Sequence, residues 1–421
     1  MAFSKYTRSM VPMDTPRQVD SSPEPFLRRL IIRNYKSIGK CDVKLHRLTV
    51  LVGRNGAGKS NFLDALRFMV DGLGTSLDHA LKARGGITNV RRRSTGHPRN
   101  FALQVEFNLP EYQVGQYGFE IAARSDGGFS VKSENLQILS PRNDVLADYK
   151  VSEGKIVKNS RKLTMPKPLA DRLFLVVASG IGEFRAAYDA LSSMGFYNLN
   201  PESMKNPQIP DAGELLHRDG DNIASVIARL GAEASQDKKR VEAFLGKIVP
   251  GIAQVDRVAI GPSETLEFRQ EVVGAEHPWR FYAANMSDGT LRSLGILVAV
   301  SQLVHLKNPV RLVGIEEPET ALHPAAARAL MEALREATDH TQVLVTTHST
   351  DLLEAMDNDP LGLLAVEARD GQTFIAPIDA ASHKTIRDHL YSAGELLRME
   401  QLDLDRQDLE RQENAPSLFP E

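Results

Sequence analysis

The sequence predicts an α/β fold in which a mixed, partly parallel central sheet is flanked by helices and joined to an antiparallel β portion and a helical insertion. First, the apolar strands "VRLVGIEE" and "TQVLVTTHS" alternate with the strong helix "AAARALMEALREAT", which is the pattern of a parallel sheet. Second, the apolar strand "LTVLV" leads through a glycine turn into a segment with helical spacing of apolar residues. Third, "FALQVEFNLP" and "QYGFEIAARSDGGFSVKSENLQIL" alternate in strand fashion and predict a hairpin at Asp126-Gly127-Gly128.

Composition limits the class of protein. The chain has 421 residues, of which 42% are hydrophobic and 25% charged, so we expect a globular protein of two or three compact units or one elaborated domain. A net charge of −3 and a pI near 6.4 exclude a uniformly basic surface but leave a local basic groove open. The single cysteine, Cys41, excludes an intrachain disulfide and a cysteine-based metal cluster, and it fits a reducing cytoplasm. No long apolar run or signal core is present, so we predict no membrane association.

We expect five segments along the chain. Residues 1–26 are rich in Pro, Ser and charge and predict a flexible N-terminal segment. Residues 27–165 form an N-terminal lobe with the glycine turn and the β-hairpin region, and residues 166–280 form a mainly helical insertion. Residues 281–380 form a C-terminal lobe that holds the two apolar strands. Residues 381–421 form a C-terminal extension whose charged end is expected to fray, and no heptad pattern predicts a long coiled coil.

The stretch "LTVLVGRNGAGKSNFLDAL" predicts a phosphate-binding loop. Glycines at the joint between a strand and a helix let backbone N–H groups approach a phosphate, because no Cβ blocks them. Lys59 can reach the β- and γ-phosphates, and the Ser60 hydroxyl can ligate Mg²⁺. A plain glycine turn is the alternative, but the strand before it and the helix after it favour the phosphate loop.

Two later stretches carry groups that phosphoryl transfer requires. Glu316 and Glu317 end an apolar strand in "RLVGIEEPETALHP", and adjacent acids point in different directions, one toward a metal and one toward an attacking water. Alternatively, such acids only complement a helix dipole. His348 closes "VLVTTHS" and is compatible with a structural role when taken alone. Because the carboxyl ends of parallel strands share one edge of a sheet, we expect these three residues near Gly53.

The stretch "NMSDGTLRSLGILVAV" places Ser287 and Gly289 before an apolar helix. A hydroxyl and backbone donors at a helix N-terminus form a natural anion site. A simple serine cap is the other interpretation.

The order of these four motifs resembles the ABC-type ATPase heads of the RecF, SMC and OLD-like group, and more narrowly the stand-alone bacterial AAA-family members of that group. The resemblance spans about Leu27 to Ala380. It implies that ATP is bound by the Walker A residues Arg54, Asn55, Gly56, Ala57, Gly58, Lys59, Ser60 and Asn61. It further implies that Ser60 and Glu316 hold Mg²⁺, although aspartate is commoner at the Glu316 position.

The resemblance also implies the remaining roles. Glu317 would be the catalytic base, and His348 the switch histidine near the γ-phosphate. The signature residues Ser287, Asp288 and Gly289 and the D-loop residue His323 would contact ATP held by a second subunit. Two heads would then enclose two ATP molecules, and hydrolysis would separate them, so we expect a homodimer or a higher even-numbered oligomer.

Several positions stay open. Asn34, Tyr35 and Lys36 are candidates to contact adenine, or are simply strand-end residues. No Q-loop glutamine is assigned, because Gln104 lies within a strand pattern. The loop "RGGITNVRRRSTGHPR" could bind nucleic acid or a partner, contribute an arginine finger, or be a solvated loop; its arginines are Arg84, Arg91, Arg92, Arg93 and Arg99. The acids Asp403 and Asp405 are interpreted as a solvated run, so no nuclease is predicted.

The resemblance favours a sensor or regulatory ATPase of an anti-phage defence or toxin-type system that acts with a separately encoded effector. A RecF- or SMC-like DNA-binding ATPase of repair or chromosome maintenance is the alternative. A nucleotide-gated scaffold with little hydrolysis is the third possibility.

Overall fold

The computed structural model describes residues 24–94, 96, 98–159, 162–301, 310–356 and 361–419. The N-terminal segment that we predicted to be flexible therefore lies outside the described residues up to residue 23. None of the helices in the described ranges is long and apolar enough to cross a membrane.

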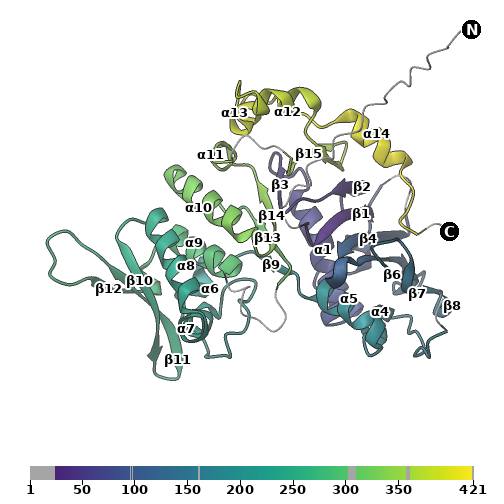
Figure 1. Ribbon diagram of the computed structural model, residues 1–421, viewed down its shortest axis with the longest axis horizontal. Coiled ribbons are helices and arrows are strands. Elements are labelled where there is room, and N and C mark those ends of the chain that lie inside the picture. The colour runs from purple at the N-terminus through teal and green to yellow at the C-terminus, as the bar shows by residue number, and fades with distance from the viewer. Residues whose placement is uncertain are drawn as a thin grey trace, which may run out of the picture.

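In the described residues, the main sheet has 13 strands in the order β8-β7-β6-β5-β4-β1-β2-β16-β15-β3-β14-β13-β9 (Figure 1). Its antiparallel half consists of β8 (Lys155–Lys158), β7 (Val145–Ser152), β6 (Phe129–Leu139), β5 (Val114–Ala123), β4 (Asn100–Asn108), β1 (Leu27–Tyr35) and β2 (Ile38–Lys44). Its parallel strands are β15 (Leu363–Arg369), β3 (Leu48–Val52), β14 (Gln342–Thr347), β13 (Leu312–Glu316) and β9 (Gly195–Tyr197). Strand β16 (Gln372–Pro377) pairs antiparallel with β15 and joins β2 through the pair Thr373 and Ile38. The predicted α/β class with a mixed sheet and an antiparallel portion is confirmed.

The parallel strands separate two apolar cores, because successive side chains of a strand face opposite sides of a sheet. On β3, Leu51 packs into one core, whereas Val50 and Val52 pack into the other. The first core is completed by α1 (Lys59–Gly74), α4 (Phe174–Ala178) and α5 (Gly182–Ser192). The second core is completed by α7 (Ile223–Glu233), α8 (Ser235–Ile248), α9 (Asp288–Ser301) and α10 (Pro324–Ala337). Burial on both faces explains why these strands are almost wholly apolar in sequence.

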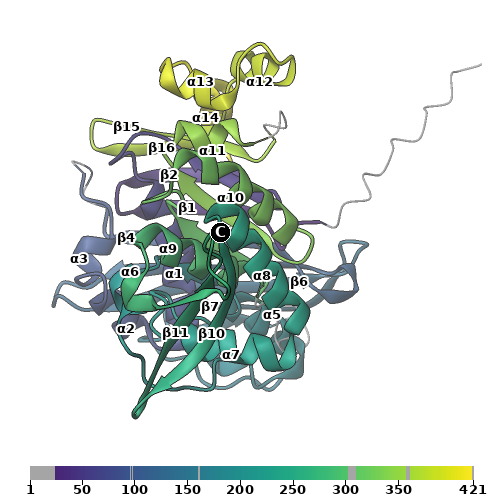
Figure 2. The ribbon, with the colours of Figure 1, turned by 90° about the vertical axis from the view of Figure 1, so that its left-hand side faces the viewer.

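The structure divides residues 166–280 differently from the mainly helical insertion that we expected. The helices α4 and α5 pack on α1, and β9 is an edge strand of the main sheet. The rest of the segment comprises α6 (Pro201–Lys205), α7, α8 and a separate three-stranded antiparallel sheet of β10 (Ile252–Ile260), β11 (Ser263–Gln270) and β12 (Trp279–Tyr282). This second sheet projects from the body of the molecule (Figures 1 and 2). No helix in the described residues exceeds the 16 residues of α1, so no long coiled coil is present there.

Short elements complete the described chain. They are α2 (Leu77–Lys82), α3 (Ile87–Val90), α11 (Thr350–Glu354) and the single 3₁₀ turns at Pro110–Tyr112 and Ala283–Asn285. The C-terminal extension forms α12 (Ala380–Arg387), α13 (Ala393–Arg398) and α14 (Arg406–Asn414).

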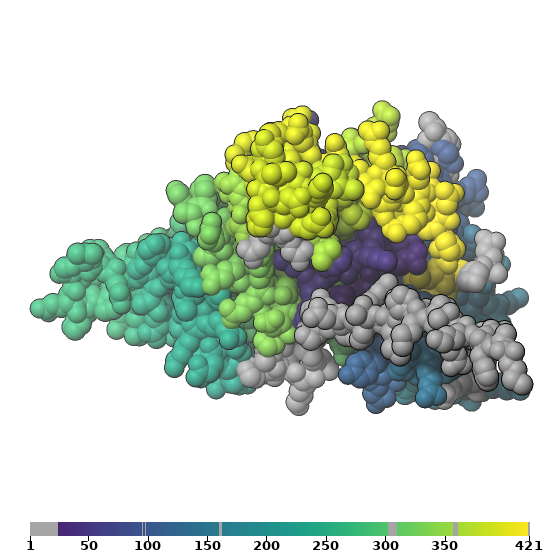
Figure 3. Space-filling view, turned by 45° about the horizontal axis from the view of Figure 1, so that its top comes forward, coloured from purple at the N-terminus to yellow at the C-terminus, as the bar shows by residue number. Residues whose placement is uncertain are grey.

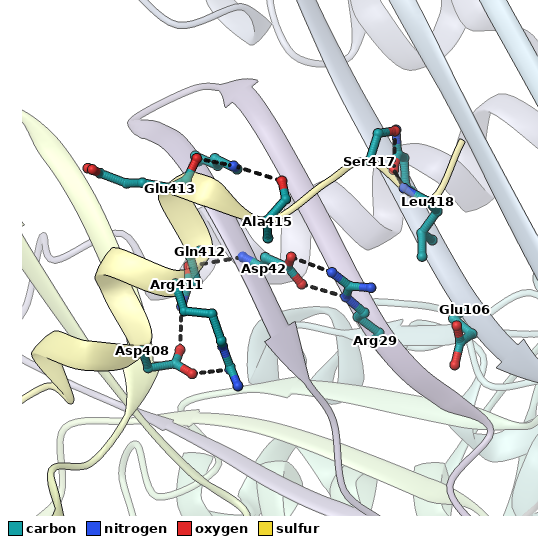
Figure 4. Close-up of polar contacts among 12 residues, drawn as sticks. Arg29, Asp42, Glu106, Asp408, Arg411, Gln412, Glu413, Ala415, Ser417 and Leu418 are labelled. Carbon is teal, nitrogen blue, oxygen red and sulfur yellow. Dashed lines mark hydrogen bonds and ion pairs between the residues drawn. The ribbon is translucent and has the colours of Figure 1, made fainter. Parts of the chain in front are cut away.

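The prediction that the C-terminal end frays is wrong for the described residues up to 419. Helix α14 docks on β2 and β16 through Gln412, which accepts a hydrogen bond from the Asp42 N–H at 3.0 Å and donates one to the Ile375 carbonyl at 2.9 Å. Figure 4 shows Gln412 facing Asp42, which is itself paired with Arg29 at 2.6 Å. In the space-filling view, the yellow C-terminal residues lie beside the purple N-terminal region (Figure 3). Asp405 caps α14 by accepting hydrogen bonds from two backbone N–H groups, so this acid has a structural role.

Candidate functional site

The register of three adjacent parallel strands brings the predicted residues to one edge of the sheet. Strand β14 lies between β3 and β13, and Thr347 is opposite Val52 while Thr346 is opposite Glu316. Gly53, His348 and Glu317 are the residues that directly follow these three strands. The glycine loop, the acid pair and the histidine therefore emerge side by side.

The glycine loop has a conformation that demands glycine. Gly58 has a φ of 103°, and a Cβ there would lie 2.1 Å from Thr373 Oγ1. A Cβ on Gly53 would lie 2.2 Å from the Val366 carbonyl oxygen. Gly56 has a φ of 77° but faces open space. Close backbone packing against β15 and β16 thus fixes the loop, and left-handed φ values leave its N–H groups without neighbouring Cβ atoms.

Lys59 begins α1 and is buried within the loop. Its Nζ donates hydrogen bonds to the carbonyls of Gly53 at 2.8 Å and Arg54 at 3.1 Å. Burial lowers the pKa of Lys59, while the charges of Glu317 and Glu319 act to raise it. The Lys59 ammonium is therefore held in the cradle, where phosphate oxygens can replace the two carbonyls. Ser60, the next residue, is exposed.

The acid pair and the histidine are in contact. Glu316 ends β13, and Glu317 has a φ of 44°, which is unusual for a residue with a Cβ. The Glu317 N–H donates to the Thr346 carbonyl at 2.9 Å. His348 Nδ1 lies 3.3 Å from Glu317 Oε1, and 42% and 36% of the two side chains are exposed. The structure thus places the predicted base and the switch histidine within reach of each other and of solvent.

Two residues of this site were not predicted from the sequence. Glu319 lies two positions after Glu317, and its Oε1 accepts a hydrogen bond from the Thr347 hydroxyl at 2.6 Å. Arg292, on α9, is half-buried; burial lowers its pKa, while the charges of Glu317, Glu319 and Glu316 raise it. Only the third acid of "EEPE" could have signalled Glu319, and nothing in a helix pattern marks Arg292.

The donor set fits Mg²⁺ bound together with a nucleotide. The described residues hold no group of three or more His, Cys, Asp or Glu side chains that could bind a metal. Mg²⁺ commonly takes only one or two protein ligands and completes its shell with phosphates and water. The Ser60 hydroxyl and the Glu316 carboxylate are suitable ligands of this kind.

The signature segment does not meet the glycine loop within the cavity beside that loop. Ser287 Oγ accepts a hydrogen bond from the Thr290 N–H at 3.2 Å and is exposed at the start of α9. Asp288 pairs with Lys205 at 2.6 Å, and a Cβ on Gly289 would lie 2.3 Å from the Ala321 carbonyl oxygen. The signature therefore packs against the following D-loop of its own chain. No signature residue lines the cavity at the glycine loop.

The other candidates occupy defined places. Asn34 lies near the end of β1 and Lys36 in the turn between β1 and β2, both with positive φ, and Lys36 Nζ is paired with Asp64 at 2.6 Å. Tyr35 is fully buried, and its hydroxyl donates a hydrogen bond to the Asp64 carboxylate at 2.8 Å, so its ring is not accessible to an adenine base. His323 caps α10 by accepting a hydrogen bond from the Ala325 N–H at 3.2 Å.

The arginines of the basic loop do not form one exposed patch. Arg84 is buried between Asp64 and Asp71. Arg92 donates to Gln372 at 2.7 Å, and Arg91 donates to the Pro98 carbonyl. Arg93 and Arg99 are exposed. Gln104 bonds to Ser417 and Leu418 of the C-terminal tail.

A cavity of about 800 Å³ lies beside the glycine loop. Its lining consists of residues 52–57, His348, Thr350, residues 365–369 of β15, and residues 397, 398, 400 and 402–404 of the C-terminal extension. Lys59, Glu316 and Glu317 do not line it. Arg54 of the loop is ion-paired with Glu400 of the C-terminal extension. The extension thus supplies one wall beside the loop, which nothing in the sequence indicated.

Comparisons with known families cover most of the chain. Residues 26–171 match the family model described as "AAA ATPase domain". Residues 181–354 match the model described as "AAA domain, putative AbiEii toxin, Type IV TA system". A search of curated proteins gave no match.

The fold is similar to that of solved SMC heads. One is an Smc head bound to the C-winged helix domain of ScpA, with 14% identity and a TM-score of 0.51 over 86% of this chain and 100% of that one. Another is an Smc head with an extended coiled coil bound to the C-terminal domain of ScpA, from Pyrococcus furiosus. It has 13% identity and a TM-score of 0.52 over 87% of this chain and 99% of that one.

Proposed function

Because this chain is an ABC-type, SMC-like AAA ATPase, we propose that it binds ATP with Mg²⁺ between two copies and hydrolyses it. In this proposal it is the sensor or regulatory ATPase of an anti-phage defence or toxin-type system with a separate effector. The observation that carries the hydrolytic part is that the glycine loop, which holds Lys59, meets Glu317 and His348 at the ends of β3, β13 and β14.

The residues have distinct tasks in this mechanism. Lys59 exchanges its two loop carbonyls for phosphate oxygens, and the loop N–H groups of residues 54–61 orient the triphosphate. Ser60 and Glu316 would hold Mg²⁺, which supplies charge neutralisation when bound. Glu317 accepts a proton from the attacking water, and His348 orients the γ-phosphate region.

The signature requires a second copy. Ser287 is exposed at the N-terminal end of α9, and Gly289 is buried there against Ala321, next to the D-loop, rather than against the glycine loop of its own chain. Their donors can complete an ATP site only from another molecule, together with Asp288 and His323. We therefore propose a homodimer, or a higher even-numbered oligomer, formed around ATP.

Phosphate release tests the hydrolytic proposal. The Glu317→Gln variant is expected to hydrolyse ATP about 10²–10⁴-fold more slowly, because the amide cannot accept the proton. In the presence of ATP this variant should accumulate as an ATP-bound dimer. Light scattering after size-exclusion chromatography measures its mass. Glu183→Gln, on the exposed side of α5, is the matched control and should behave as wild type. Equal rates for wild type and Glu317→Gln would remove Glu317 from catalysis, and no release by wild type would favour a nucleotide-gated scaffold.

The defence role rests on the description of the family matched by residues 181–354, which names a toxin of a Type IV TA system. Phage plating on cells that carry the gene with its genomic neighbours tests it. Protection of the cells against phage should require Lys59, so phage should plate normally on cells that carry Lys59→Ala. Equal plating with and without the wild-type genes contradicts the defence role.

The SMC-head fold favours a second candidate, an ATP-dependent DNA-binding ATPase of repair or chromosome maintenance. DNA affinity that requires ATP and falls steeply with salt would support it. Absence of binding at low salt would reject it.

A further inference from the structure

Glu319 is a buried acid that connects the loop after β13 with the loop after β14. Its side chain is 10% exposed. Its Oε1 accepts hydrogen bonds from the Thr347 hydroxyl at 2.6 Å and from the His348 N–H at 3.3 Å. One carboxylate oxygen therefore fixes the backbone on which His348 stands.

The connection continues into α11. The Thr347 hydroxyl oxygen accepts a hydrogen bond from the Ser349 N–H at 2.9 Å, and Ser349 Oγ accepts one from the Leu352 N–H at 3.2 Å. A short chain of bonds thus runs from Glu319 through Thr347 and Ser349 to the start of α11. Any displacement of Glu319 must move His348 or break these bonds.

The second oxygen of Glu319 has no hydrogen-bond partner in the described structure, although it is buried. An unpaired buried carboxylate oxygen is costly, so native proteins usually supply it with a donor. His348 Nδ1 lies 3.8 Å from Oε1, too far for a hydrogen bond. The charge of Glu319 also acts to raise the pKa of Lys59 and of Arg292, so this carboxylate lies near the lysine of the proposed phosphate site.

We propose that Glu319 is a positioning residue, in which Oε1 holds His348 beside Glu317 and Oε2 accepts a hydrogen bond from a water molecule that enters with the nucleotide. This inference rests on the proposed function of the site. Glu319 does not contact the nucleotide itself. It determines the positions of His348 and of the water molecule.

Three variants separate the two oxygens. Glu319→Gln keeps an oxygen acceptor for Thr347 and His348 but replaces the other oxygen by an amide donor. Glu319→Ala removes both acceptors. Thr347→Val leaves Glu319 in place but removes the hydroxyl, and with it both the bond to Glu319 Oε1 and the bond from the Ser349 N–H. Glu183→Gln is the control.

The first measurement does not depend on hydrolysis. In protein labelled with ¹³C at histidine Cε1, the His348 resonance is assigned among the 11 histidines with His348→Gln. Glu319→Ala and Thr347→Val should shift or broaden this resonance in nucleotide-free protein, and Glu319→Gln should leave it close to its wild-type position. An unchanged His348 resonance in Glu319→Ala would overturn the positioning role. If Glu319→Ala does not fold, Thr347→Val decides the same point.

The second measurement is steady-state hydrolysis. Glu319→Gln should lower kcat at least about tenfold with KM within about threefold of wild type, because the water loses its acceptor while nucleotide contacts remain. An unchanged kcat would overturn the role of Oε2. If wild type releases no phosphate while the His348 resonance still responds to Glu319→Ala, the proposed hydrolysis fails but the positioning of His348 by Glu319 stands. The role of Oε2 is then rejected with the hydrolysis.

Discussion

Among single residues, the glycines of the phosphate loop differ in what they tolerate. Gly58→Ala should destabilise the nucleotide-free protein by about 1–3 kcal/mol more than Gly56→Ala, because only at Gly58 does the new methyl overlap Thr373. Both variants share the penalty of a positive φ. Urea unfolding of the two variants measures the difference. Equal stabilities would show that Thr373 moves aside freely.

Asp64 is the shared partner of three cationic side chains in the N-terminal lobe. It contacts Lys36 at 2.6 Å, Arg67 at 2.5 Å and the buried Arg84 at 3.0 Å. Asp64→Asn should lower the free energy of unfolding by about 3 kcal/mol, because it leaves the buried Arg84 and the partly buried Arg67 and Lys36 without their shared carboxylate. Asp78→Asn, whose pair with Lys82 is exposed, should cost less than about 1 kcal/mol.

The effect of Asp64 should depend on pH in a defined direction. Burial raises the pKa of Asp64, but Arg84, Arg67 and Lys36 overcome it and hold the pKa below its usual 3.8. The carboxylate therefore contributes stability that is fully present above pH 3.8 and is lost as pH falls through the lower pKa of the folded state. Urea unfolding at pH 7 and at successively lower pH should show the difference from Asp64→Asn narrowing only below pH 3.8. A difference that grows on acidification contradicts this assignment.

At the scale of helices and strands, the sequence predicted the elements that bury apolar faces. The apolar strand "LTVLV" is β3, with the same bounds, Leu48–Val52. The segment with helical spacing that we expected after the glycine turn is α1 (Lys59–Gly74). Their apolar periodicity reflects burial against the two cores, which is the signal that sequence patterns carry. The meeting of Gly53, Glu317 and His348 at one edge of the sheet followed from the rule on strand ends. The order of β3, β14 and β13 was not predicted and comes from the structure.

Elements held by polar or distant contacts could not be predicted in the same way. Helix α14 buries only Asp408 and Gln412, so its sequence has no apolar stripe. Strand β9 has three residues and owes its strand conformation to pairing with β13. Lys36 was a nucleotide candidate, and its pairing with Asp64 depends on a contact between a turn and a helix that periodicity does not report.

Gln412 should hold α14 in place as a unit. In Gln412→Ala, the Asp42 N–H and the Ile375 carbonyl lose their partner, so amide exchange in α14 should accelerate at least about tenfold. Gln407→Ala, on the exposed face of the same helix, should leave exchange unchanged. Hydrogen exchange followed by mass spectrometry reports both. Equal exchange in the two variants would show that α14 does not depend on Gln412.

Across the whole molecule, the two halves of the main sheet meet at a narrow join. Among the described residues, β2 and β16 share the single pair Thr373 and Ile38. Gln412 bonds to one strand on each side of this join, to Asp42 on β2 and to Ile375 on β16. Thr373 also donates to the Ala57 carbonyl of the phosphate loop at 2.8 Å. The C-terminal extension therefore holds the two halves of the main sheet together close to the phosphate loop.

Cys41 lies within β2 beside this join and is fully buried. Burial raises the pKa of its thiol well above the usual value, so thiol reagents should modify the native protein at least about 100-fold more slowly than the urea-unfolded protein. The rate of colour release from a disulfide reagent measures this. Rapid reaction of the native protein would mean that β2 opens readily.

Because the native thiol of Cys41 is expected to react slowly, a spectroscopic probe can be attached selectively to an introduced cysteine. A cysteine introduced at Val273, which is fully exposed beyond β11, would be the only fast-reacting sulfur. Donor and acceptor dyes attached there on different copies would report the approach of two molecules in real time by energy transfer, without removing Cys41.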